Sequence, residues 1–234
     1  MIQKNWQDLI KPQRLDVQPG RRPDRDAMIV VEPLERGFGI TLGNALRRVL
    51  LSSLQGAAIT QIHIDGVLHE FSTIPGVMED VATIILALKD VRVRMNTEGP
   101  KTIRIRKSGE GIVTAGDFMS ADQTVEIMNP GHKICTLGPD STFDLEATVN
   151  LGKGYVLADR NKTEEMSIGT IPIDSVFSPL RRVNYTVTPA RVGRETDFDR
   201  LNLELWTDGA IAPADAVAFA AKILKEQLTI FINF

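Results

Sequence analysis

The chain has 234 residues, of which 43% are hydrophobic and 24% are charged, and its formal net charge is −3. This length suits one large domain or two smaller ones with a sizeable core. The charge excludes the basic excess expected of a dedicated DNA-binding protein, so any basic patch must be local. The single cysteine, Cys135, excludes an internal disulfide. Because no apolar run approaches the ~18 residues that span a bilayer, we expect a cytoplasmic protein without contact to a membrane.

The first part of the chain predicts an arm, two strands and a helix. Residues 1–13 carry short apolar pieces, including Trp6, that suit docking on a neighbour. Strands are predicted at residues 14–17 and 27–32. From Leu42 onward, large apolar residues recur at spacings of three and four, which is the period of one helical face. They are Leu42, Leu46, Val49, Leu50 and Leu54. Burying them contributes on the order of 10 kcal/mol, so this face is core or dimer interface.

The opposite face of this predicted helix mixes charge with an aliphatic side chain. Asn44, Arg47 and Arg48 share it with Leu51, which a purely solvated face does not need. We therefore interpret this face as free for a partner. Three glycines surround the helix start, where each costs helix stability unless a close contact requires it, and we interpret them as packing requirements. They are Gly37, Gly39 and Gly43.

The middle of the chain is predicted to be mostly β-strand. After residue 56 the hydrophobic period changes from helical to alternating, which marks a candidate domain boundary. A second helix is predicted from Pro75 onward, with Lys89 at its end. Residues 91–95 and 103–106 predict a hairpin with an arginine-rich face, made of Arg92, Arg94, Arg104 and Arg106. Residues 158–167 are polar and predict a loop.

The last third predicts a strand pair followed by a long helix. The strands are expected at residues 184–188 and 201–206, with a charged turn at 193–199, and the helix runs from Pro213 towards Phe231. One apolar stripe of this helix contains Val217, Ala221, Leu224, Leu228 and Phe231, and another contains Phe219, Ile223, Ile230 and Phe234. Two stripes need two covering surfaces, so we expect the helix to pack on its own domain and on another chain.

Two long sequence blocks resemble a known family. The first is ERGFG at residues 35–39 followed by TLGNALRR at residues 41–48, and the second is IDGVLHEFST at residues 64–73. In this order they resemble the bacterial RNA polymerase alpha subunit, in its N-terminal assembly domain. The resemblance extends from about Asp16 to the last residue. It implies an α+β fold in which residues 1–54 and 178–234 form a discontinuous dimerisation domain. Residues 55–177 would form an inserted, mostly β domain that contacts the large subunits.

The resemblance also implies a function and partners. The chain would be a noncatalytic scaffold subunit of DNA-directed RNA polymerase, a nucleotidyltransferase, which homodimerises and nucleates assembly of the beta and beta-prime subunits for transcription. No cofactor is expected in this chain, and DNA would be contacted only indirectly through the holoenzyme. The family's C-terminal DNA-binding domain is expected to be absent from it.

Site residues follow from the helix patterns and the resemblance together. We predict beta-subunit contact by Arg47, Arg48 and Leu51, and a possible large-subunit contact by Lys89. The predicted dimer interface comprises Phe38, Leu42, Leu46, Val49, Leu50, Leu224, Leu228 and Phe231.

Candidates for catalysis or metal binding in the chain itself are weak. Asp24 with Asp26, and Asp197 with Asp199, are the only close carboxylate pairs that suit magnesium, and both fall in predicted turns, where Asp favours local hydrogen bonds. Zinc needs three or four ligands, more than His132 and Cys135 supply. We therefore predict no catalytic residue and no metal site. Two alternatives remain, an RNA-binding module that uses the arginine hairpin and an enzyme with a spatially assembled site.

Overall fold

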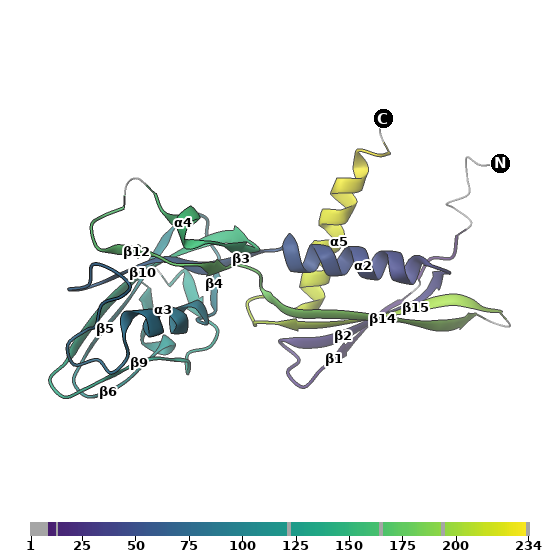
Figure 1. The fold of residues 1–234 in the computed structure, drawn as a ribbon. Helices are drawn as coiled ribbons and strands as arrows, with labels where there is room; N and C mark the ends of the chain where they lie inside the picture. Colours follow the sequence, from purple (N-terminus) through teal and green to yellow (C-terminus); the bar gives the residue numbers. More distant parts are fainter. Residues whose placement is uncertain (1–8, 13, 121–122, 164–165, 193–194, 233–234) are drawn as a thin grey trace. The chain divides into compact units, whose positions relative to one another are not determined.

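The computed structural model describes residues 9–12, 14–120, 123–163, 166–192 and 195–232 (Figure 1). The chain divides into two compact units: unit 1 combines Met1–Leu54 with Pro179–Phe234, and unit 2 is Gln55–Ser178. Unit 1 combines a sheet with two long helices, whereas unit 2 is mostly β, so the predicted α+β fold with an inserted β part is confirmed. Trp6 and Phe234 lie outside the described residues.

Unit 1 contains a four-stranded antiparallel sheet in the order β1-β2-β15-β14. The strands are β1 (Arg14–Pro19), β2 (Asp26–Glu35), β14 (Leu180–Val192) and β15 (Glu195–Thr207). The predicted strand pair of the last third is confirmed, and both of its strands are longer than predicted. The predicted charged turn is wrong in its second half, because Asp197 and Asp199 already lie within β15, where Asp199 pairs with Pro189.

Two helices, α2 (Phe38–Ser52) and α5 (Pro213–Thr229), pack on this sheet. Their buried side chains meet those of the sheet in one core, formed by Ile29, Leu50, Leu54, Leu180, Val183, Leu203, Leu205, Ala216, Val217 and Ala220. The helical periods therefore predicted both helices correctly. The boundaries differ, since α2 begins four residues before Leu42 and α5 ends before Phe231.

The close approach of α2 to the sheet depends on two glycines. A Cβ atom on Gly43 would lie 2.5 Å from Cδ2 of Tyr185, and one on Gly39 would lie 2.7 Å from Cγ1 of Val187. Both are packing requirements, as predicted. Gly37 is not, because a Cβ atom there would meet nothing within 4 Å. Its φ of 89° instead gives the left-handed conformation that starts the helix, which glycine adopts without a steric cost.

Replacing Gly43 with alanine is expected to destabilise the protein by up to about 2 kcal/mol. Overpacking against the Tyr185 ring costs about 1–3 kcal/mol, and the better helix propensity of alanine offsets about 1 kcal/mol of it. Urea unfolding followed by circular dichroism measures the difference. Gly131→Ala is the matched control, because its added Cβ atom would meet nothing within 4 Å. A stability raised by about 1 kcal/mol in Gly43→Ala, as helix propensity alone predicts, would contradict the packing argument.

Unit 2 is built around two long strands, β3 (Gln55–Ile64) and β10 (Thr142–Lys153), in a sheet of order β7-β5-β10-β3-β4-β8, with β12 also on β3. The other strands are β4 (Val93–Met95), β5 (Lys101–Ser108), β6 (Gly111–Thr114), β7 (Met119–Ser120), β8 (Val125–Ile127), β9 (Lys133–Leu137), β11 (Tyr155–Val156), β12 (Thr170–Pro172) and β13 (Ser175–Val176). The helical segments are α3 (Val81–Lys89), the 3₁₀ helix η2 (Ala115–Asp117) and α4 (Ala158–Asn161). Helix α3 buries Val81, Ile84, Ile85 and Leu88 in the core of this unit.

Three local predictions in unit 2 need correction. The second helix begins at Val81 and not after Pro75, because the Asp80 carboxylate caps it by accepting a hydrogen bond from the Thr83 N–H at 2.8 Å. The arginine hairpin does not exist, since β4 pairs with β3 and β8 whereas β5 pairs with β10 and β7. The predicted polar loop contains α4.

Candidate functional site

The predicted beta-contact residues lie on α2, and the structure gives each a different environment. The guanidinium of Arg47 is held by unit 1 itself, because its Nε donates to the carbonyl of Val183 at 3.2 Å. Leu51 is half-buried and packs against the core of unit 1, so it does not lie on a fully free face as predicted. Arg48 is exposed, and its guanidinium makes no hydrogen bond or ion pair with any residue that the structure describes. Of the three, Arg48 therefore offers the most to a partner.

The predicted dimer residues separate into buried and exposed groups. Leu50 is fully buried in the core of unit 1, so a single chain already covers it. Leu42, Leu46, Val49 and Leu224 are half-buried. Phe38, Leu228 and Phe231 are 44%, 56% and 70% exposed. Among the predicted dimer residues, the most exposed side chains thus lie at the start of α2 and at the end of α5.

The second half of α5 is poorly covered by its own unit. Only residues in the first half of the helix are buried, namely Pro213, Ala216, Val217 and Ala220. Figure 1 shows α5 crossing α2 and continuing beyond it towards the C-terminus. Ile230 and Ile232, directly after the helix, are 72% and 76% exposed. Ile232 was not predicted as an interface residue, although it continues the same apolar end.

Lys89, the possible large-subunit contact, forms an ion pair within unit 2. Its Nζ lies 2.7 Å from Oδ2 of Asp174, and Oδ1 of Asp174 accepts the Ala158 N–H at 2.8 Å. The hydrogen bond from Lys89 lowers the pKa of the Asp174 carboxyl, the Ala158 N–H acts in the same direction, and burial opposes both. This pair connects the end of α3 to the segment that carries α4. Asp174 could not be predicted as the partner of Lys89, because 85 residues separate the two.

Removing Lys89 is expected to weaken this connection in a pH-dependent way. The pKa of Asp174 is lower in the folded than in the unfolded chain, so its contribution is complete above the ordinary carboxyl pKa and is lost as pH falls through the folded value. In Lys89→Ala the pKa of Asp174 should rise towards its unfolded value, so the loss should be smaller and should be complete at a higher pH. At neutral pH we expect a destabilisation of about 0.5–1 kcal/mol, since the pair is partly exposed. An NMR titration of the Asp174 carboxyl checks the direction, and an unchanged or lowered pKa would contradict it.

Three of the four arginines of the predicted hairpin are bound to acidic side chains, so they do not form a free basic surface. Arg104 binds Asp144 through two hydrogen bonds of 2.7 Å, and Arg106 donates to the same carboxylate at 3.0 Å. Arg94 forms an ion pair with Glu126 on the neighbouring strand β8. These acidic partners compete with phosphate for the same guanidinium groups. The arrangement does not favour the RNA-binding alternative.

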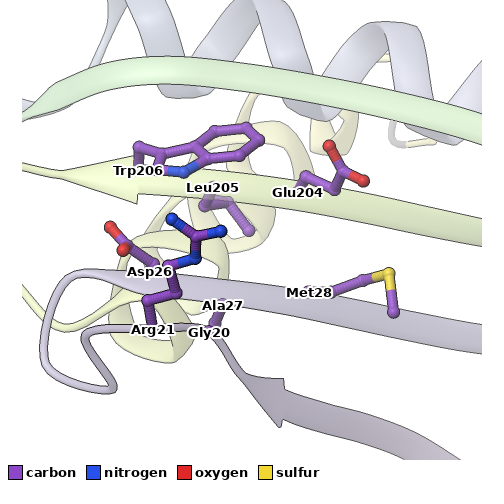
Figure 2. A pocket seen from close by; sticks show the side chains of 8 residues that line it. All are labelled: Gly20, Arg21, Asp26, Ala27, Met28, Glu204, Leu205 and Trp206. Atoms are coloured by element: carbon purple, nitrogen blue, oxygen red, sulfur yellow. The ribbon is translucent and has the colours of Figure 1, made fainter.

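A hollow of about 380 Å³ opens on unit 1 at the β1–β2 turn. Figure 2 shows the side chains of Arg21, Asp26 and Trp206 at one end and those of Met28 and Glu204 at the other. Asp26 is already bound by Arg22 through two hydrogen bonds of 3.2 Å. The lining mixes both signs of charge and contains none of the predicted site residues. The hollow does not favour a stand-alone enzyme.

The two candidate metal ligands are engaged elsewhere. A ring nitrogen of His132, Nε2, lies 2.9 Å from the carbonyl of Ala87 near the end of α3. Cys135 is fully buried, and this burial raises the pKa of its thiol to about 12, so the thiolate that zinc requires is disfavoured. No group of three or more His, Cys, Asp or Glu side chains suited to a metal ion occurs among the described residues.

The fold belongs to a class of α+β proteins in which an inserted, mostly β unit interrupts a helix-and-sheet unit. The family described as RNA polymerase Rpb3/RpoA insert domain matches residues 62–178, which is half of the chain. The chain therefore belongs to this family of RNA polymerase subunits. This match is consistent with the resemblance to the N-terminal domain of the bacterial alpha subunit. No helix in the described parts of the chain is long and apolar enough to cross a membrane.

Proposed function

We propose that this chain is a noncatalytic scaffold subunit of DNA-directed RNA polymerase, which homodimerises and then recruits the beta and beta-prime subunits. The observation that carries the proposal is the combination, in unit 1, of an uncovered apolar end of α5 with an exposed, unpaired arginine on α2. The first feature suits a second copy of the chain. The second suits a larger subunit that supplies an acidic partner.

The apolar end of α5 supports self-association. Leu228, Ile230 and Phe231 are each more than half exposed, and together with Ile232 they form an apolar stretch at the end of the helix that only Thr229 interrupts. Exposed apolar stretches of this kind mark protein interaction sites. In a two-fold dimer the same patch is used by both copies, so one apolar patch is sufficient to close the interface. We assign Phe38, Leu42, Leu46, Val49, Leu224, Leu228 and Phe231 to the dimer interface.

The surface around Arg48 supports recruitment of the beta subunit. An arginine beside a partly covered apolar residue is a common anchor at protein interfaces, and its planar guanidinium can bind a carboxylate through two hydrogen bonds. Arg47 and Leu51 flank Arg48, and their contacts to unit 1 fix its surroundings. Lys89, bound to Asp174, remains a second candidate contact to a large subunit.

The proposal assigns no catalytic residue and no cofactor to this chain. Transcription chemistry would take place in the large subunits, and DNA would be contacted only through the assembled enzyme. The expected location is the cytoplasm.

Sedimentation velocity of the purified chain, alone and with the beta and beta-prime subunits, tests the proposal. We expect a dimer at micromolar concentration and a larger complex when the beta subunit is added. Beta-prime should join once the beta complex has formed. A chain that stays monomeric and does not change its sedimentation with either large subunit would overturn the proposal.

A further inference from the structure

The start of α2 is capped by a side chain that is distant in sequence. One carboxylate oxygen of Asp199, Oδ2, accepts hydrogen bonds from the backbone N–H of Gly37 at 2.8 Å and of Gly39 at 3.0 Å. The helix has no side-chain cap of its own and no acidic residue in its first turn. Asp199 lies on β15 and therefore replaces the local cap that most helices carry. Its negative charge also suits the positive end of the helix dipole.

The same helix is attached to the sheet at a second point. Nε of Arg47 donates to the Val183 carbonyl on β14, between two and three turns from the cap. Between these points, Gly43 lets α2 lie close to Tyr185, since a Cβ atom there would be only 2.5 Å from Cδ2 of the ring. The cap, the close glycine contact and the arginine bond together fix both the position of α2 along its axis and its rotation. Arg48, the residue after Arg47, has no such attachment and depends on the helix for its position.

We infer that Asp199 is a positioning residue for the Arg48 docking surface, and this inference rests on the proposed function. Asp199 does not need to touch the large subunit. Its carboxylate keeps the first turn of α2 hydrogen-bonded and in register with the sheet, so the guanidinium of Arg48 is presented in one place. Without the cap, the first turn can open and α2 can shift along the sheet. The docking surface then adopts its binding conformation only part of the time, which weakens binding of the partner.

Two substitutions at Asp199 separate the hydrogen bonds from the charge. Asp199→Ala removes the acceptor of both N–H groups, and we expect about tenfold weaker binding of the purified beta subunit, which corresponds to about 1.4 kcal/mol. Asp199→Asn retains one carbonyl oxygen, and both hydrogen bonds use a single oxygen in the structure. We therefore expect the asparagine variant to bind the beta subunit within about twofold of the unchanged chain. Asp197→Ala, which removes an exposed carboxylate from the same strand, is the matched control.

A measurement on the unchanged chain keeps the inference testable even if Asp199→Ala folds poorly. With glycine labelled by ¹⁵N, the amide protons of Gly37 and Gly39 should exchange slowly, and Asp199→Asn should preserve this protection. Rapid exchange of both amides in the unchanged chain would overturn the inference. So would an asparagine variant that binds the beta subunit as weakly as the alanine variant.

A double-mutant cycle distinguishes failure of this inference from failure of the proposed function. If Asp199 acts through Arg48, Asp199→Ala should weaken binding much less in an Arg48→Ala background than in the unchanged chain. If Arg48→Ala binds the beta subunit normally, the proposed docking surface is wrong. If Arg48→Ala weakens binding but Asp199→Ala does not, the docking surface stands and the positioning role is wrong.

Discussion

Replacing Arg48 with alanine is expected to leave the dimer intact and to weaken capture of the beta subunit by about 2–5 kcal/mol. Arg48 is exposed in the single chain, so the fold does not depend on its guanidinium. In the assembled enzyme the same group would be buried against an acidic partner, and truncation would leave that partner's charge unpaired. Sedimentation velocity with a titration of the beta subunit measures both the dimer and the complex.

Two further variants identify what Arg48 contributes. Arg48→Lys keeps the charge but loses the planar fork of donors, so it should recover only part of the affinity if a carboxylate is bound through two hydrogen bonds. Arg21→Ala removes an exposed arginine at the β1–β2 turn, outside the proposed docking surface, and should bind normally. Assembly of Arg48→Ala with unchanged affinity would show that the docking surface lies elsewhere.

Periodicity predicted the elements of unit 1 because its helices and sheet each bury one face. Leu46, Val49 and Leu50 follow the helical period, and all three meet the core as that pattern requires. The boundaries of α2 were not predictable in the same way. Its start depends on Gly37 and on Asp199, a residue 160 positions or more from the amides that it binds. A distant side chain that caps a helix leaves no local signal.

For the predicted arginine hairpin, both strands were predicted correctly but their pairing was wrong. The runs around Arg94 and Arg104 alternate correctly and both become strands, but each pairs with other partners. Alternation identifies a strand and its two faces, whereas the choice of neighbour depends on contacts that are distant in sequence. The predicted basic face is wrong for the same reason, because it assumed that the two arginine-bearing strands pair with each other. Once β5 pairs with β10, Asp144 is placed beside Arg104 and Arg106.

The outcome for each predicted site residue also depends on whether its neighbours are close or distant in sequence. Arg48 was identified by its place on a helical face, and the structure leaves it exposed. Leu51 was placed on the same face, but helix faces are broad, and its side chain reaches the core of unit 1. Lys89 was predicted as a contact from the family resemblance and from its place at a helix end, whereas its partner Asp174 lies in a distant part of the sequence of unit 2. Whether a long side chain is exposed or paired therefore depends on neighbours that are distant in sequence.

Introducing a carboxylate into the end of α5 is expected to separate the dimer. Leu228→Asp combined with Phe231→Asp places two charges in the apolar stretch of each chain, and a two-fold interface would contain four. Burying an unpaired carboxylate costs several kcal/mol. We therefore expect the dissociation constant to rise by at least about a thousandfold, which makes the variant monomeric at micromolar concentration. Sedimentation equilibrium measures this change directly.

The fold of the single chain should survive this double substitution, because Leu228 and Phe231 are largely exposed and the buried contacts of α5 come from its first half. Circular dichroism should therefore remain unchanged. Ala218→Asp adds the same charge to the neighbouring charged face of α5, which the helical period also assigns to Lys222 and Lys225, and should stay dimeric. If the double variant remains dimeric while Ala218→Asp dissociates, the interface lies on the charged side of the helix. If both remain dimeric, α5 does not form the interface, and the surface it leaves uncovered serves another partner.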